Sequence, residues 1–271
     1  MFLDIVRRIV PIKYRQSFGL WTAHQASRSK LLLYPYLLLL CGTVPKNLRL
    51  IPNDECIITY RGHEIISPRD SIFTSWEVLQ AEIYEKVYKP LNGDVVVDIG
   101  AHIGLFSVKA SLQVGSAGIV IAIEPARTNR VYLRLNTLPL LNVRVVDCAV
   151  GISEKVGYIT TSEASPCHTL VSEPDIDTET VRVDTLDNIL SKMHIDRVDF
   201  IKIDAEGSEL DILKGATDTL KNNKLRLAVA SYHNLPNGEY ELPHIQRFLI
   251  SAGFRITTIK EYVYADNLEA K

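Results

Sequence analysis

The sequence predicts an α/β protein built on a mostly parallel sheet of seven strands, of which the last runs antiparallel. From residue 94 onward, short β-branched runs alternate with amphipathic helical stretches, which is typical of a parallel sheet with helices on both faces. The last two runs, 254–259 and 262–265, are too close together for a crossover helix and must form a hairpin. The chain has 271 residues, of which 46% are hydrophobic, so it can bury the core of such a sheet and is neither disordered nor a disulfide scaffold.

The elements of this fold follow from the pattern of apolar residues. The predicted strands are 95–99, 119–124, 143–147, 199–204, 225–232, 254–259 and 262–265, and the predicted helices between them are 102–114, 129–135, 208–220 and 243–252. Before the sheet, two β-rich runs flank Arg61-Gly62 and predict a small hairpin within 55–73. Residues 76–88 then repeat apolar side chains at helical spacing and predict a helix.

The first 50 residues differ from the rest of the chain in charge. They contain eight basic side chains and one acid, which gives a net charge of +7. Because the whole chain has a net charge of −2, the remaining residues have a net charge of −9. Apolar residues at helical spacing predict a basic, helical N-terminal extension over 1–52, followed by a domain over 53–271 whose core starts near 94. Two interpretations stay open, because the extension could contact an anionic membrane or cap the domain. Nucleic acid is the weaker partner, since the acidic remainder would repel phosphates.

Cysteine spacing and hydropathy indicate the cellular compartment in which the protein is expected. The four cysteines lie far apart and have no metal-ligand spacing with histidines, so no zinc site or disulfide framework is predicted and a cytoplasmic location is expected. The longest apolar run, 31–41, is about half a membrane span and contains Pro35, so no transmembrane helix is predicted. A signal peptide fits poorly, because some thirty residues rich in polar side chains precede that run.

The strongest local motif is VVVDIGAHIG at 95–104, a buried strand that ends in Asp98 and turns through Gly100 and Gly104 into a helix. Glycine lets a ligand approach the backbone, and the first helical turn offers N–H groups without partners in the helix. The GxxxG spacing differs from the dinucleotide fingerprint, which disfavours an oxidoreductase. An acid just before the first glycine would repel a pyrophosphate but could accept from the amino group of an amino-acid-like ligand.

Two further acids end the next two predicted strands. Glu124 follows Gly100 by 24 positions, close to the spacing of an acid that accepts from ribose hydroxyls, and Asp147 could accept from an adenine amino group. Because the carboxyl ends of parallel strands meet at one edge, where open α/β sheets bind ligands, we expect Asp98, Glu124 and Asp147 to lie together. Ordinary solvated acids are the alternative interpretation.

A second cluster is expected at the ends of the fourth and fifth strands. Asp204, Glu206 and Glu209 could orient a substrate, act as a base or bind a hard cation, although Glu209 also suits a first-turn acid favoured by the helix dipole. His233, with a reference pKa near 6.5, could remove a hydroxyl proton or simply cap a backbone group. Lys202 lies in a buried strand and is predicted to pair with a strand-end acid.

Five runs, in this order and spacing, resemble the FkbM family of S-adenosylmethionine-dependent methyltransferases over about residues 55–265. They are DVVVDIGAHIGLFSV, IAIEP, VVDCAVG, VRVDTLD and DFIKIDAEGSELDILKGA. The resemblance implies the Rossmann-like methyltransferase fold, with S-adenosylmethionine as the cofactor. The resemblance implies that Asp98, Gly100 and Gly104 hold the methionine end of the cofactor, Glu124 its ribose and Asp147 its adenine. The further candidates for cofactor binding are Ala101, His102, Cys148 and Glu82, of which Glu82 resembles a position that closes over the pocket. The family often has Asn where His102 stands, and Tyr88 resembles a second position that closes over the cofactor.

The residues and the resemblance predict methyl transfer to an oxygen, with His233, Asp204 and Glu206 as the catalytic candidates. The resemblance implies the acceptor, a sugar hydroxyl on a glycan, glycolipid or related metabolite. An N- or RNA methyltransferase and a non-catalytic binding protein that keeps the fold are the alternatives. No metal ligands are predicted, and a divalent metal requirement stays open. His168 has a weaker claim, in the polar loop 160–173 that could cover the acceptor.

Overall fold

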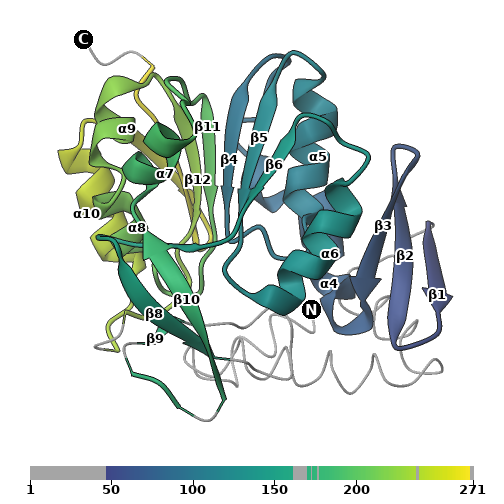
Figure 1. The fold of residues 1–271 in the computed structure, drawn as a ribbon. Coiled ribbons are helices and arrows are strands. Elements are labelled where there is room, and N and C mark those ends of the chain that lie inside the picture. Colours follow the sequence, from purple (N-terminus) through teal and green to yellow (C-terminus); the bar gives the residue numbers. More distant parts are fainter. Residues whose placement is uncertain (1–46, 161–169, 172, 176, 236–237, 269–271) are drawn as a thin grey trace. The chain divides into compact units, whose positions relative to one another are not determined.

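The computed structural model describes residues 47–160, 170–171, 173–175, 177–235 and 238–268 (Figure 1). A membrane contact or a cap is predicted for residues 1–50, and the first 46 of these lie outside this part of the chain. His168 also lies outside it. The described residues form two compact units, of which the first ends at Ala81 and the second begins at Glu82. No helix among the described residues is long and apolar enough to cross a membrane.

The first unit contains a three-stranded antiparallel sheet in the order β1-β2-β3. Its elements are β1 (Leu48–Ile51), β2 (Glu55–Tyr60), β3 (His63–Pro68), the short 3₁₀ helix η1 (Arg69–Ser71) and helix α4 (Ile72–Leu79). The predicted hairpin is confirmed, and Arg61 and Gly62 both have positive φ, as a two-residue hairpin turn requires.

Two predictions for this region are corrected. The extension predicted as helical to residue 52 includes β1, whose four residues pair antiparallel with β2. The predicted boundary at 53 therefore lies inside the three-stranded sheet. The helix predicted over 76–88 ends at Leu79, because Glu82 adopts a left-handed conformation and only the short 3₁₀ helix η2 (Ile83–Glu85) follows.

The second unit confirms the predicted seven-stranded sheet, in the order β13-β14-β12-β11-β4-β5-β6. Its strands are β4 (Val95–Ile99), β5 (Ile119–Ile123), β6 (Val143–Val146), β11 (Phe200–Ile203), β12 (Arg226–Ala230), β13 (Arg255–Ile259) and β14 (Tyr262–Asp266). Strand β14 lies antiparallel between β12 and β13, whereas β12, β11, β4, β5 and β6 are parallel. The predicted acids Glu124, Asp147 and Asp204 each directly follow a strand end.

Helices cover both faces of this sheet (Figure 1). They are α5 (Leu105–Val114), α6 (Arg127–Thr137), α7 (Leu186–Lys192), α8 (Glu209–Lys214), α9 (Thr217–Asn222) and α10 (Leu242–Ser251). Side chains of α7 to α10 pack with one strand face in the main core, whereas Leu133 of α6 packs with Ala122 on the other. The single helix predicted over 208–220 is two helices, because α8 ends at Gly215, where a Cβ would lie 2.0 Å from the Gly151 carbonyl oxygen.

A second small sheet and helix α7 have no counterpart in the sequence predictions. This sheet has the order β7-β10-β8-β9, and its strands are β7 (Ala149–Val150), β8 (Lys155–Thr160), β9 (Leu170–Val171) and β10 (Thr178–Asp184). Strands β8 and β10 pair antiparallel over six residues. Part of the loop predicted over 160–173 is therefore a strand, while residues 161–169 lie outside the described chain.

Candidate active site

A buried ion pair joins two neighbouring strands at the carboxyl edge of the sheet. Lys202 and Asp98 lie opposite one another on β11 and β4, and Lys202 Nζ is 3.1 Å from Asp98 Oδ1. Lys202 also donates to the carbonyl oxygens of Ile99 (3.2 Å) and Gly100 (2.6 Å), while Ser107 Oγ donates to Asp98 Oδ2 at 2.6 Å. The predicted pairing of Lys202 is confirmed. Asp98 is fully buried and its carboxylate contacts Lys202 and Ser107, so its contact with a ligand amino group stays a prediction.

The glycines of the turn allow backbone segments to approach one another. Gly100 has a φ of 72°, and a Cβ there would lie 1.8 Å from the carbonyl oxygen of Asp204. Gly104 has a φ of 90°, and its Cβ would meet Leu133 at 2.8 Å. Ala101 between them is buried. The contact at Gly100 places the turn after β4 directly against the turn after β11, and the contact at Gly104 places the same turn against α6.

Glu124 connects the same turn to the end of β5. Its carboxylate accepts from the backbone N–H of His102 at 2.8 Å and of Ala126 at 2.9 Å. His102 has a φ of 52°, a left-handed conformation that these bonds help to hold. Asn129 Nδ2 also donates to this carboxylate, at 3.4 Å. The ribose contact of Glu124 stays a prediction.

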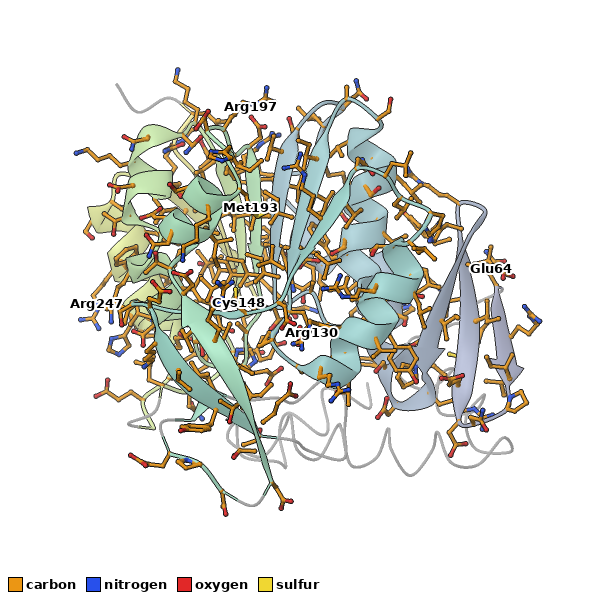
Figure 2. The ribbon with its side chains drawn as sticks, viewed as in Figure 1. Glu64, Arg130, Cys148, Met193, Arg197 and Arg247 are labelled. Carbon is orange, nitrogen blue, oxygen red and sulfur yellow. The ribbon has the colours of Figure 1, made fainter. Side chains whose placement is uncertain are left out.

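Asp147 ends the neighbouring strand β6 and is exposed, with Arg130 Nη1 2.7 Å from its Oδ1. Arg130 of α6 and Cys148 are labelled in Figure 2. Cys148 is buried, and burial raises the pKa of its thiol. Strand order thus brings Asp98, Glu124 and Asp147 to adjacent strand ends, as predicted, although only Asp147 presents an exposed side chain.

Glu82 lies in the segment that precedes the sheet and pairs with two lysines. Its carboxylate is 2.7 Å from Lys89 Nζ and 3.1 Å from Lys109 Nζ. The hydrogen bond from Lys89, helped by Lys109, lowers the pKa of Glu82 against the opposing effect of burial. Tyr88 donates to Asp266, and burial together with this carboxylate raises the pKa of Tyr88 to about 12. Neither residue's predicted position over the cofactor is tested by these contacts.

Two tyrosines converge on the carboxylate of Asp204. Tyr84 donates from its hydroxyl to Oδ2, and the Tyr232 hydroxyl lies 3.3 Å from Oδ1. Both rings also contact Tyr262 edge to face, with centroids 5.9 and 5.7 Å apart. Sequence analysis did not find Tyr84, because it lies 120 positions before Asp204 and no local motif links the two.

His233 lies among three carboxylates. Its Nδ1 is 2.9 Å from Glu209, while its Nε2 is 3.5 Å from Glu206 and 3.9 Å from Asp204. Burial alone would lower the pKa of His233, but the charges and hydrogen bonds of Glu209 and Glu206 raise it well above 6.5. Both ring nitrogens face carboxylates, and this position together with the raised pKa favours the imidazolium form, which suits a general base poorly. The role of His233 as the general base stays a prediction.

Glu209 is fixed from three sides. Its oxygens accept from the backbone N–H groups of Ala205 (2.7 Å) and Gly207 (2.9 Å). Burial opposes ionisation, but the charge of His233 and hydrogen bonds from His233 and Glu241 lower the pKa of Glu209 to about 2. The alternative interpretation of Glu209 is a first-turn acid that is favoured only by the helix dipole. This interpretation does not account for the ion pair of Glu209 with His233.

Glu241 completes this network and was not found by sequence analysis. It is fully buried, and its Oε1 accepts from the backbone N–H of Leu210 at 2.8 Å. Burial and the neighbouring charge of Glu209 raise the pKa of Glu241 to about 9, so it is a neutral acid at pH 7 that donates to Glu209. No residue pattern around position 241 signals this contact, which depends on how α10 packs against α8.

Asp204, Glu209 and His233 also have the composition of a cation site, since one ligand atom of each lies within 4.8 Å of the others. Glu209, however, already accepts two backbone N–H groups and faces a protonated ring. A metal ligand histidine must be neutral. The group therefore fits a buried ion pair better than a cation site.

The seven-stranded sheet, with acids at the carboxyl ends of β4, β5 and β6, is the Rossmann-like fold of S-adenosylmethionine-dependent methyltransferases. Residues 98–256 match the methyltransferase FkbM domain, and this chain belongs to the FkbM methyltransferase family. The comparison with curated proteins finds no match.

Among solved structures, a methyltransferase FkbM from Methylobacillus flagellatus KT is 22% identical, with a TM-score of 0.47, over 73% of this chain. The chain covers only 54% of that protein. A SAM-dependent methyltransferase from Aquifex aeolicus is 20% identical, with a TM-score of 0.42, over 71% of this chain and 92% of its own. Fibrillarin from Aeropyrum pernix, solved with S-adenosyl-L-methionine bound, is 13% identical, with a TM-score of 0.45, over 80% of this chain and 84% of its own.

Proposed function

We propose that this chain transfers the methyl group of S-adenosylmethionine to a sugar hydroxyl of a glycan or glycolipid. The observation that carries the proposal is the group of Asp204, Glu206 and His233 beside Tyr84 and Tyr232. Carboxylates accept hydrogen bonds from hydroxyls, and the partly exposed ring of Tyr232 supplies an apolar surface for the C–H face of a sugar. This combination suits a neutral, hydroxyl-rich acceptor.

Glu206 is the residue of this group that we assign to proton removal. It is partly exposed at the end of the turn after β11, and burial raises the pKa of its carboxyl despite the opposing charge of His233. A carboxylate with a raised pKa is a stronger base than an ordinary one. His233 then holds Glu206 in place and balances the negative charge of the three surrounding acids.

The cofactor would occupy the adjacent strand ends. The turn from Gly100 to Gly104 and the carboxylates of Glu124 and Asp147 fit the methionine end, ribose and adenine in that order. When bound, the cofactor supplies an electrophilic methyl group on a sulfonium, and the protein mainly aligns it with the acceptor oxygen. The site residues lie at the carboxyl ends of β4, β5, β6 and β11, which are consecutive in the sheet.

The test is incubation of the full chain with isotopically labelled S-adenosylmethionine and separate glycan, lipid, RNA and protein fractions. We expect label in the glycan or lipid fraction, as an O-methyl sugar with the mass of one added methylene group. The variant Glu206→Gln should bind the cofactor normally but lower turnover by roughly 10²–10⁴. Label in RNA or protein would contradict the acceptor, and cofactor binding without any transfer would support the non-catalytic alternative.

A membrane contact of residues 1–50 remains part of this proposal, because their charge of +7 matches anionic lipids. A cytoplasmic location, at the inner face of the membrane, fits the cysteine spacing.

A further inference from the structure

The outer side of helix α6 carries a row of exposed apolar side chains. Val131, Leu135 and Leu138 are 54%, 51% and 78% exposed, and Leu141 just after the helix is 100% exposed. Positions 131, 135 and 138 follow helical spacing and share one side, whereas Leu133 is buried in the core. Exposed large apolar groups that gather in this way mark interaction surfaces.

Basic residues accompany these apolar groups. Arg127 and Arg134 are exposed and lie at helical spacing with Val131 and Leu138. From 125 to 146 the chain contains four arginines and no acid. Three acids outside this stretch contact it around the first turn of α6. Glu179 accepts from the Arg127 backbone N–H at 3.2 Å, Glu124 accepts from that of Ala126 at 2.9 Å, and Asp147 Oδ1 lies 2.7 Å from Arg130 Nη1. We use the name α6 face for Arg127, Val131, Arg134, Leu135, Leu138 and Leu141.

We propose that the α6 face binds the surface of an anionic lipid membrane. Leucine and valine side chains would enter the boundary between headgroups and acyl chains, while the two arginines meet lipid phosphates. Charge argues against two other occupants. A second copy would bring the arginines of two α6 faces together, and the basic N-terminal extension carries charge of the same sign. RNA would engage the arginines but would leave the leucines in water.

The position of α6 gives this contact a consequence for the active site. Strand β6 is at the edge of the seven-stranded sheet, and α6 packs against it (Figure 1). The helix begins three residues after Glu124, at the carboxyl edge of the sheet. A helix that lies flat on a membrane would keep this edge beside the lipid surface. Access to a lipid-linked acceptor rests on the proposed function, whereas membrane binding itself does not.

The test is co-sedimentation of the full chain with phosphatidylcholine vesicles that contain or lack phosphatidylserine. We expect binding to the anionic vesicles that falls as salt rises. Leu138→Ser with Leu141→Ser should weaken it by about tenfold for each leucine, and Arg127→Gln with Arg134→Gln by about fivefold for each arginine. Ile250→Ser is the matched control, because Ile250 on α10 is 59% exposed but lies outside the α6 face.

Four results would contradict membrane binding by the α6 face. Unchanged vesicle binding by the double leucine variant, or no binding by the wild type, would overturn the proposal. Dimers that the leucine variant abolishes, or RNA binding that depends on Arg127 and Arg134 without vesicle binding, would assign the α6 face to another partner and also overturn it. Cofactor affinity should be equal in all variants, so a failed vesicle result leaves the proposed methyl transfer standing.

Discussion

Lys202 Nζ lies 3.1 Å from Asp98 Oδ1, and this buried pair connects the two strands whose ends form the cofactor turn and the acid cluster. Breaking a buried ion pair from one side leaves an uncompensated charge. We therefore expect Lys202→Met to lower the free energy of unfolding by about 3–5 kcal/mol. The measurement is urea unfolding, with cofactor titration of the folded variant.

The double variant Asp98→Asn with Lys202→Met is the control for this prediction. It removes both charges, so it should be more stable than Lys202→Met alone. Equal losses in the single and double variants would show that the pair does not interact as described.

Gly100 tests the contact between the turns after β4 and β11. A Cβ at this position would lie 1.8 Å from the Asp204 carbonyl oxygen, so Gly100→Ala must displace backbone. We expect a loss of stability of at least about 2 kcal/mol and weaker cofactor binding. Gly93→Ala is the matched control, because Gly93 has a φ of 82° but open space around its Cβ position. Its cost should be only about 1–2 kcal/mol of backbone strain, and a similar cost at both positions would contradict the close contact.

The sheet and part of the site could be predicted from the sequence for a physical reason. Strands that are buried on both faces appear as continuous apolar runs, and the acids that follow them, such as Glu124 and Asp204, reach one edge through parallel topology alone. The pairing of Lys202 could be predicted because a buried lysine charge is costly unless a carboxylate pairs with it. These inferences use only local sequence and the sheet order.

The partners across the fold could not be predicted in this way. Tyr84 meets Asp204, and Glu241 meets Glu209, only because separate helices and turns pack together. The protonated state of His233 depends on the same packing, since it needs Glu206 and Glu209 on both sides of the ring. No residue spacing encodes these distances.

Glu241 should make stability depend on pH. Its pKa is about 9 in the folded protein and about 4.5 when unfolded, so its contribution is complete below pH 4.5 and is lost as pH rises toward 9. Glu241→Gln cannot lose a proton, yet its amide can donate to Glu209 and accept from Leu210. The stability of this variant relative to the wild type should therefore increase between pH 5 and 9.

The measurement is urea unfolding of both proteins at several pH values in that range. His233 and Glu209 remain in both proteins, so the difference between them isolates Glu241. A difference that stays constant with pH would mean that Glu241 is already ionised at neutral pH.

Lys109 holds the segment that carries Tyr84. It is fully buried on α5, pairs with the buried Glu85, and lies 3.1 Å from Glu82. Lys109→Met would leave Glu85 as an uncompensated buried charge, so we expect a loss of about 3–5 kcal/mol of stability. Because Tyr84 lies between the two acids and donates to Asp204, turnover should also fall in the fraction that stays folded.

Lys89→Met is the matched control for Lys109→Met, because Lys89 pairs with the same Glu82 from an exposed position. An exposed pair contributes at most about 1 kcal/mol, so this variant should keep nearly normal stability and turnover. Unfolding curves and kcat are measured for both variants and for Tyr84→Phe. Together they show whether the buried pair of Lys109 positions Tyr84 against Asp204. If Lys109→Met lowers stability but leaves kcat equal to that of the wild type, the buried pair supports the fold without positioning Tyr84 against Asp204. If Tyr84→Phe and Lys109→Met lower kcat to a similar degree, the segment places the tyrosine at the site.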